Sequence, residues 1–469
     1  MTTNPYRELP AIERLLAHPR VAPLAERHGH EAIVRVAREV LDDYRAAIER
    51  SGALPEVPAA EAVADRAASL EPSLRRVVNA SGVIIHTNLG RAPLSDATIS
   101  AMAAASGGYS NLEFDLDAGE RGSRFSHLTE LLARVTGAEA GIAVNNNASA
   151  LLLALSSLCA GGEVVIARGQ LVEIGGGFRI PDVMRQSGAT LVEVGTTNRT
   201  YLRDYAEAIS ERTVALLRVH ASNFRVVGFT EETPLPALAS LARERGLLLI
   251  DDLGSGALLD PRGYGLGAEP LVRDSVAAGV DVTLFSGDKL VGGPQAGVAV
   301  GREGAIAAMQ RHPLARAVRM DKASIAGLAA TLGHYARGEA IEEIPIWRMI
   351  AAPADGLRRR ARRWARACGD EVAASVETAR SMIGGGSLPG EGLESPVCAI
   401  AAPPGGADAF AAALRAADPP IVARIERGAV LLDPRTVEPR DDRHVADSLA
   451  ALSRPGEGAE GTPEQSAGR

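Results

Sequence analysis

The chain contains only two lysines, Lys289 and Lys322, among its 50 lysine and arginine residues. A buried lysine can lose its proton and attack a carbonyl, whereas an arginine guanidinium stays protonated and cannot form a Schiff base. Lys289 follows the apolar run 281–285 and lies among the small residues of 286–294. This pattern predicts a strand that ends in a loop, where open α/β sheets commonly place reactive side chains. Lys322 has charged neighbours, as a surface lysine does. Arginine-for-lysine bias can also reflect genome composition, so scarcity alone does not indicate function.

Two more segments have residues suited to a phosphate-bearing cofactor. Residues 144–150 join a predicted strand to an apolar helix, and small polar residues at a helix N-terminus present free N–H groups to a phosphate, although they are also ordinary helix caps. The predicted strand before Asp251 and Asp252 is followed by the sequence Leu-Gly-Ser-Gly. A carboxylate there can pair with a protonated pyridine nitrogen or simply cap the next turn. Lys289 follows Asp252 by 37 residues, and this order predicts a pyridoxal-phosphate enzyme of the aminotransferase-like fold.

Alternating apolar runs and helix-length spacers must position these residues. The pattern predicts an α/β fold with a mostly parallel sheet. The apolar runs lie at 141–144, 163–167, 190–194, 214–219 and 247–251. Helical periodicity in residues 10–50 predicts a small N-terminal helical domain. Beyond Gly338, an arginine-rich helix at 357–368 and strands near 397–401, 421–425 and 429–432 predict a smaller α+β domain. The expected domains are 1–74 (helical, with linker), 75–338 (large, catalytic), 339–452 (small) and a disordered tail, 453–469.

The charge and cysteine content of the chain argue against several classes of protein. The formal net charge of −8 over 469 residues argues against a surface that attracts nucleic acid everywhere, but it leaves room for a local basic patch. The three cysteines lack CxxC spacing, so we expect neither a disulfide framework nor a metal site. The same pattern indicates a reducing compartment. There is no leader-like N-terminal segment and no run of about 18 apolar residues. These features predict a cytoplasmic protein with no membrane or DNA partner.

Several longer segments resemble bacterial selenocysteine synthases, the L-seryl-tRNA(Sec) selenium transferase family. The resemblance runs from the N-terminal helices to about residue 450. The segments that carry it are 79–94 (NASGVIIHTNLGRAPL), 168–176 (RGQLVEIGG), 219–224 (VHASNF), 252–256 (DLGSG) and 286–297 (SGDKLVGGPQAG).

The resemblance implies a fold type I pyridoxal-phosphate enzyme that converts L-seryl-tRNA(Sec) to L-selenocysteinyl-tRNA(Sec). The selenium donor would be selenophosphate, and the reaction would pass through a cofactor-bound dehydroalanyl-tRNA. The N-terminal domain would bind the tRNA, and its arginines could contact RNA phosphates, although neighbouring acids weaken that signal. The chain would assemble as a homo-oligomer, usually a decamer made of five dimers.

The resemblance also assigns roles to particular residues. Lys289 would hold pyridoxal 5'-phosphate covalently and act as the base, and Asp252 would face the pyridine nitrogen. The residues implied around the cofactor phosphate are Asn146, Asn147, Ala148 and Ser286, and those near the ring or its 3-oxygen are His220 and Asn223.

Three arginines would hold the anion of the selenium donor, because guanidinium forks bind tetrahedral oxyanions. They are Arg91, Arg316 and Arg319, of which the last two could instead be a solvated helix face. Asp288 would orient the amine or the substrate, or it is an ordinary turn aspartate.

Two other functions fit parts of the sequence. A related pyridoxal-phosphate lyase or transferase acting on a small amino acid or amino sugar would share the Lys289 region. The long segment before residue 75 and the three arginines favour the selenium transferase over this alternative. The second alternative is a catalytically silent RNA-binding or scaffold protein of the same fold. The presence of Lys289 in a chain that otherwise almost lacks lysine argues against it.

Overall fold

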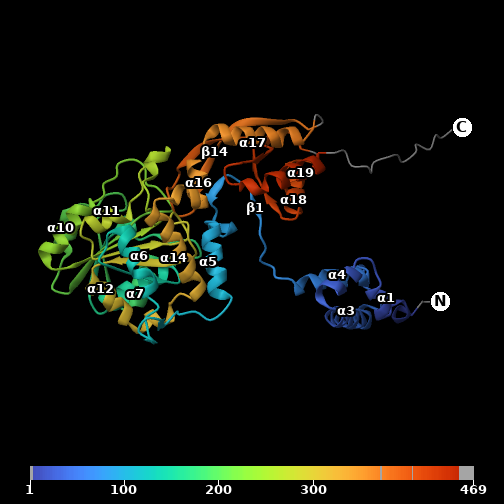
Figure 1. Ribbon diagram of the computed structural model, residues 1–469, viewed down its shortest axis with the longest axis horizontal. Helices are drawn as coiled ribbons and strands as arrows, with labels where there is room; N and C mark the ends of the chain where they lie inside the picture. The colour runs from blue at the N-terminus through green and yellow to red at the C-terminus, as the bar shows by residue number, and fades with distance from the viewer. Residues whose placement is uncertain (1–3, 370–371, 404, 454–469) are drawn as a thin grey trace. The chain divides into compact units, whose positions relative to one another are not determined.

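The computed structural model describes residues 4–369, 372–403 and 405–453. The chain divides into two compact units, 1–76 and 77–469, which are considered separately (Figure 1). Apart from Ser453, the predicted tail 453–469 lies outside the described residues. Among the described residues, no helix combines the length and apolar character needed to cross a membrane.

The first unit is a helical bundle built on one long amphipathic helix, α3 (His30–Ser51). Its buried residues recur every three or four positions, as in Ile33, Val36 and Val40, so one face packs against the shorter helices. Gly52 ends α3 in the left-handed conformation, with φ of 72°. The other elements are η1 (Pro5–Glu8), α1 (Ile12–Leu16), α2 (Ala22–His28), α4 (Ala59–Ala67) and η2 (Ala68–Leu70).

The second unit is organised around a seven-stranded sheet. Its strand order is β5 (Ala140–Val144), β13 (Gly297–Gly301), β12 (Val282–Ser286), β11 (Leu248–Gly254), β10 (Thr213–Val219), β6 (Glu163–Ala167) and β9 (Thr190–Val194). Strand β13 runs antiparallel to β5 and β12, and every other neighbouring pair is parallel. Four of the strands, β5, β6, β12 and β13, are buried along their whole length, as expected of a sheet covered on both faces. The predicted α/β fold class is confirmed.

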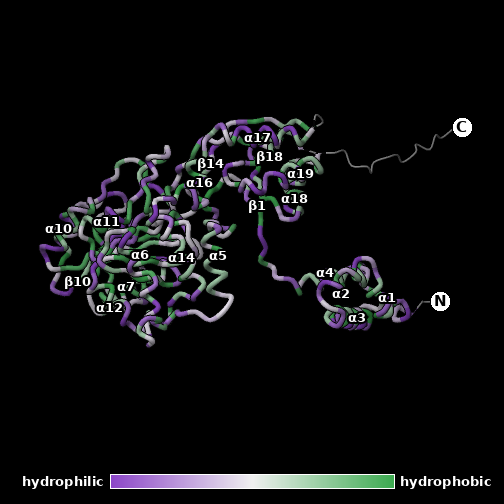
Figure 2. Tube along the Cα trace, in the orientation of Figure 1, coloured by the Kyte–Doolittle hydropathy of each residue, from purple (hydrophilic) through white to green (hydrophobic). Residues whose placement is uncertain are grey.

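Helices pack on both faces of this sheet, and hydrophobic residues (green) run through the middle of the unit (Figure 2). The helices are α5 (Asp96–Ser106), α6 (Ser126–Thr136), α7 (Asn147–Leu158), α8 (Ile180–Ser187), α9 (Leu202–Ala208), α10 (Leu235–Arg245), α11 (Val272–Ala277), α12 (Glu303–Arg311), α13 (Pro313–Ala317) and α14 (Lys322–Arg337). Short elements complete this part: η3 (Thr87–Leu89), β3 (Phe114–Asp115), β4 (Glu120–Arg121), η4 (Arg168–Gln170), β7 (Glu173–Ile174), β8 (Phe178–Arg179) and η5 (Pro261–Tyr264).

The C-terminal part of this unit carries a second, five-stranded sheet. Its order is β17 (Arg424–Glu426), β18 (Ala429–Leu432), β15 (Gly392–Ile400), β14 (Ala374–Gly384) and β2 (Val83–Ile85). A two-stranded pair joins β1 (Val78–Asn79) to β16 (Ile421–Val422). The helices here are α15 (Ala340–Glu343), α16 (Pro345–Ala351), α17 (Ala354–Ala367), α18 (Ala407–Arg415), η6 (Pro439–Asp441) and α19 (Asp442–Leu452). Strands from the two segments expected as separate domains, 75–338 and 339–452, therefore pair with one another, and both segments lie within one compact unit.

Candidate functional site

Lys289 lies in the loop after β12, and only 7% of its surface is exposed. The loop is held by its own backbone, since the N–H of Gly287 donates to the carbonyl of Ala296 at 2.8 Å. Burial lowers the pKa of the Lys289 amine, and the positive charge of Arg91 lowers it further, while nearby carboxylates act in the opposite direction. A buried amine with a lowered pKa is more readily neutral, which is the form that attacks carbonyls and accepts protons.

Backbone from the C-terminal part of the unit covers the end of this amine. Gly386 has φ of +79°, and a Cβ added there would lie 2.5 Å from Nζ of Lys289 and 2.9 Å from its Cε. A Cβ on Gly385 would lie 2.2 Å from the hydroxyl oxygen of Thr87. No side chain fits at either position without displacing a neighbour. The run of three glycines at 384–386 is the sequence feature that corresponds to this contact, and it was not among the predicted site residues.

The two aspartates at the end of β11 have different partners. Oδ1 of Asp252 accepts hydrogen bonds from the side-chain amide of Asn147 at 2.8 Å and from the N–H of Gly254 at 3.1 Å. Burial raises the pKa of the Asp252 carboxyl to about 6, against the opposing effect of these hydrogen bonds and of Lys289. Asp251 is fully buried, and its carboxylate accepts hydrogen bonds from the guanidinium of Arg218 and the hydroxyl of Ser275. Asp252 is therefore the one that shares the surroundings of Lys289.

The start of α7 brings the predicted phosphate residues to the same edge of the sheet. Asn146 caps the helix, with its side-chain oxygen accepting from the N–H of Ser149 at 2.9 Å. Asn147 directs its amide to Asp252, while Ala148 occupies the first helical turn. Ser286 ends β12, two strands away from β5, and is buried. Asn146 and Ala148 thus sit at a helix N-terminus, where free N–H groups favour an anion.

His220 and Asn223 follow β10 but lie in different surroundings. The N–H of His220 donates to the carbonyl of Asp252 at 2.8 Å, which fixes its backbone beside the site. Nε2 of His220 lies 3.6 Å from Oε1 of Glu269, beyond hydrogen-bond distance, and both atoms lack a partner among the described residues. Asn223 is exposed and donates to the carbonyl of Glu173 at 3.0 Å. No described contact joins Asn223 to Lys289 or Asp252.

The three predicted anion-binding arginines do not meet one another through described contacts. Arg91, in the left-handed region with φ of 66°, donates to Asp288 at 2.5 Å. Arg316 is exposed at the end of α13 and has no ion pair to a described residue. Arg319 lies beyond α13, where its backbone forms a bridge with Val144, and its guanidinium is 3.9 Å from Glu113. Because α13 ends at Ala317, the alternative of one solvated helix face carrying both arginines is wrong.

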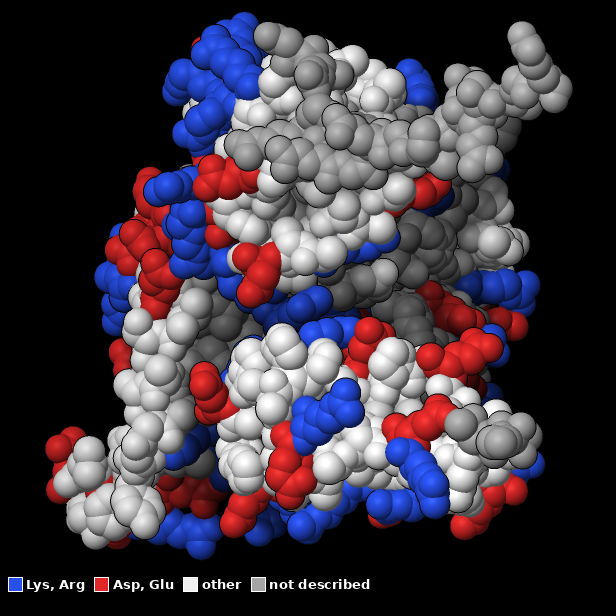
Figure 3. All heavy atoms as spheres, turned by 90° about the vertical axis from the view of Figure 1, so that its right-hand side faces the viewer, with Lys and Arg blue, Asp and Glu red and all other residues white. Residues whose placement is uncertain are grey.

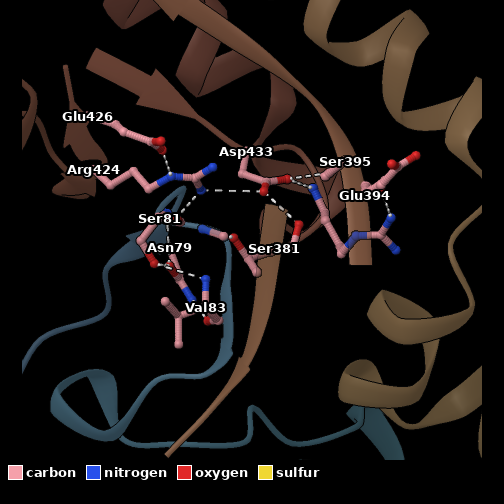
Figure 4. Close-up of polar contacts among 12 residues, drawn as sticks. Asn79, Ser81, Val83, Ser381, Glu394, Ser395, Arg424, Glu426 and Asp433 are labelled. Carbon is pink, nitrogen blue, oxygen red and sulfur yellow. Dashed lines mark hydrogen bonds and ion pairs between the residues drawn. The ribbon is translucent and has the colours of Figure 1, made fainter. Parts of the chain in front are cut away.

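A buried polar network fixes the segment that leads to Arg91 (Figure 4). Asp433 is fully buried and accepts hydrogen bonds from Ser381 on β14 at 2.7 Å and from Ser395 on β15 at 2.8 Å. Arg424 lies 3.6 Å from Asp433 and donates to the carbonyl of Ser81 at 2.5 Å, just before β2. This network holds the chain where β2 begins and so helps to place the turn that carries Arg91. No local pattern predicts this role of Asp433, because Ser381 and Ser395 lie 52 and 38 positions away in the chain.

Several buried polar atoms around Lys289 and Asp252 have no partner within the described residues. They are Oδ1 of Asn147, Nε2 of His220, Oε1 of Glu269 and the hydroxyl oxygens of Ser222 and Ser255. A cavity of about 400 Å³ has His220 and Glu269 in its wall. Buried polar groups are normally hydrogen-bonded, so this set fits a polar ligand that would supply the missing partners. No group of three or more potential metal ligands was found among the described residues.

Comparison with known proteins covers almost the whole chain. Residues 77–438 match the family described as L-seryl-tRNA selenium transferase, and residues 6–45 match selenocysteine synthase N terminal. A protein from Nitratidesulfovibrio vulgaris named L-seryl-tRNA(Sec) selenium transferase is 49% identical over 465 residues, covering 95% of this chain and 98% of that relative. A protein of the same name from Moorella thermoacetica is 47% identical over 454 residues, covering 95% and 96%.

The fold also matches a solved structure. A D-glucosaminate-6-phosphate ammonia-lyase superposes with a TM-score of 0.58 at 24% identity, covering 81% of this chain and 96% of that one. This likeness concerns the fold alone. The family matches and the two relatives agree over both units of the chain, so the chain belongs to the L-seryl-tRNA selenium transferase family.

Proposed function

We propose that this chain converts L-seryl-tRNA(Sec) to L-selenocysteinyl-tRNA(Sec) in the cytoplasm, with selenophosphate as the selenium donor. The observation that carries the proposal is the buried amine of Lys289, close enough to Asp252 for their charges to interact, in a chain of this family. The two relatives named L-seryl-tRNA(Sec) selenium transferase support the substrate. Selenophosphate as the donor rests on the resemblance noted in the sequence.

The residues present fit pyridoxal 5'-phosphate. Lys289 would hold it covalently, Asp252 would face its ring nitrogen, and His220 would lie near the ring. The N-terminus of α7, from Asn146 to Ala148, and Ser286 would receive its phosphate. The unpartnered atoms of Asn147 and His220 support this assignment, because a bound polar group would satisfy them. When bound, the cofactor supplies an electron sink for negative charge that develops at the α-carbon of the seryl group.

The chain's own residues handle the protons. With its pKa lowered by burial, Nζ of Lys289 can be neutral and take the proton from the α-carbon of serine, and later return it. Asp252 has a pKa of about 6, so it is mostly ionised at neutral pH and can stabilise a protonated ring nitrogen. Because residue 386 is a glycine, no Cβ occupies the space next to Nζ of Lys289. Close packing of backbone against the amine also limits access of water to it.

The donor's anion would be held by arginines. Asp288 fixes one edge of the Arg91 guanidinium at 2.5 Å, which orients it and leaves its other N–H groups free for an oxyanion. Arg316 and Arg319 would complete the binding site. No described contact joins Arg316 or Arg319 to Arg91. The three guanidinium groups would therefore converge only when the donor binds or when the subunits assemble. We propose a homo-oligomer, a decamer of five dimers, in which the 1–74 segment binds the tRNA.

The test compares two serine substrates. Purified full-length protein is supplied with the cofactor, selenophosphate and either seryl-tRNA(Sec) or free L-serine, and the amino acid products are separated after release from the tRNA. The proposal predicts selenocysteine from seryl-tRNA(Sec) and no consumption of free serine. Consumption of free serine with the charged tRNA left unchanged would instead identify a small-molecule lyase.

A further inference from the structure

Helix α17 concentrates positive charge on the surface of the second unit. Its 14 residues contain six arginines and one aspartate, Asp355, in a chain whose formal net charge is −8. At the chain's average arginine content, the same length would hold roughly one or two. Genome-wide preference for arginine over lysine therefore does not account for this cluster. In Figure 3, a group of Lys and Arg side chains stands at the upper left, at the height where Figure 1 draws α17.

The inner side of α17 explains only part of this charge. Leu357, Ala361 and Trp364 are buried and pack the helix onto the C-terminal sheet. Arg360 donates to Asp442 and to the carbonyls of Pro434 and Val437, which gives it a structural role. The guanidinium of Arg363 also donates to Asp442.

Four arginines of α17 have no structural contact of this kind: Arg366, exposed in the last turn, and three nearer the start of the helix. Arg358 is half-buried, Arg359 and Arg362 are exposed, and none of them makes a hydrogen bond or ion pair with another described residue. Arg358 and Arg362 are four residues apart and Arg359 is three before Arg362, so their side chains are neighbours at about 5–6 Å on the outer face. A hollow of about 510 Å³ beside the first turns has Arg359, Arg360 and Arg363 in its wall. Like charges held this close repel one another, which costs free energy unless an anion is bound.

We infer that the outer face of α17, formed by Arg358, Arg359 and Arg362, binds the phosphate backbone of the tRNA substrate. The inference rests on the proposed function, which makes an RNA the large polyanion that this enzyme must hold. Guanidinium groups suit phosphates because they donate two hydrogen bonds in a planar fork. In the first unit, Arg20, Arg27, Arg45 and Arg66 are already paired with acids. The α17 face would thus add tRNA contacts from the catalytic unit itself.

The test uses the full-length protein with three glutamines replacing arginine (Arg358→Gln, Arg359→Gln, Arg362→Gln). Glutamine has nearly the helix propensity of arginine, so α17 should persist. The control carries Arg245→Gln, Arg273→Gln and Arg415→Gln, which remove the same charge from exposed arginines elsewhere in the second unit. Binding of uncharged tRNA(Sec) is measured over a range of salt concentrations, together with turnover of seryl-tRNA(Sec).

For the α17 variant we expect tRNA affinity to fall roughly 10- to 100-fold and the slope of log affinity against log salt to shrink by about two to three. KM for seryl-tRNA(Sec) should rise while kcat at saturation stays unchanged, and the control should behave as wild type. Wild-type affinity and salt slope in the α17 variant would overturn the inference. An inactive wild type would instead count against the proposed function.

Discussion

Gly386 offers a direct test of how closely the catalytic lysine is enclosed. In Gly386→Ala, the new methyl group would lie 2.5 Å from Nζ of Lys289, whereas heavy atoms in ordinary contact are about 3.5 Å apart. The amine must therefore withdraw by about 1 Å. A misplacement of this size commonly costs on the order of 10²-fold in rate, so we expect turnover of seryl-tRNA(Sec) to fall by at least that factor. The positive φ adds about 1–2 kcal/mol of destabilisation, because alanine disfavours the left-handed region.

A matched control separates contact from backbone strain. Gly428 has φ of +80° with nothing within 4 Å of an added Cβ, so Gly428→Ala has the same conformational cost without touching the lysine. It should lose stability but keep its turnover. In the Lys289→Ala background the clash disappears, and the stability lost on adding Gly386→Ala should shrink to that of Gly428→Ala in urea unfolding. Equal turnover of Gly386→Ala and Gly428→Ala would refute the placement of the glycine segment against Lys289.

Two other predictions follow from buried carboxylates. With a pKa raised to about 6, Asp252 is protonated more readily in the folded than in the unfolded protein, so the stability it contributes is present below about pH 4 and is lost as pH rises through 6. Asp252→Asn should remove this pH dependence of stability, which we expect to be on the order of 2–3 kcal/mol between pH 4 and 7 in urea unfolding of the cofactor-free protein. It should also lower turnover by on the order of 10²-fold. An unchanged pH dependence of stability would contradict the raised pKa of Asp252. Asp433→Asn should cost about 3–5 kcal/mol, because it removes the fully buried carboxylate that pairs with Arg424 and leaves this half-buried guanidinium only the exposed Glu426 as an ion-pair partner among the described residues. Glu426→Gln, on the exposed side of Arg424, should cost less than about 1 kcal/mol, and similar losses for the two variants would contradict the role of the network.

Local patterns in the sequence predict most of the large sheet. The apolar run 163–167 coincides with β6, which is buried along its whole length because helices cover both faces of the sheet. The run 190–194 coincides with β9, an edge strand in which only Val194 is buried. Strand β14 was not predicted, since its alternation of exposed and buried residues is irregular. The pairing of β2 with β14 was also not predicted, because it joins residues about 300 positions apart and no local pattern encodes it.

The same limit applies to the site. Lys289, Asp252 and the start of α7 stand out because their types and positions after strands suggest chemistry. The contact of Asn147 with Asp252, and that of Gly386 with Lys289, depend on how strands and the C-terminal part pack. Glu269 is buried beside His220 and has no signal of its own in the sequence. Asn223 was expected near the ring of the cofactor. Its side-chain amide donates a hydrogen bond to the carbonyl of Glu173, and its role beside the cofactor stays a prediction.

If Lys289 carries out selenium transfer to a tRNA-bound serine, radioactive selenium should reach the tRNA only when this lysine is present. Wild type, Lys289→Ala and Lys322→Ala are given seryl-tRNA(Sec) and selenophosphate labelled with radioactive selenium, and label attached to tRNA as selenocysteine is counted. Lys322 is a suitable control because it is the other lysine of the chain and its half-buried side chain donates to the carbonyl of Gly108. We expect labelled selenocysteinyl-tRNA from wild type and Lys322→Ala, and none from Lys289→Ala. Labelled product from Lys289→Ala, or its absence from wild type, would contradict the account.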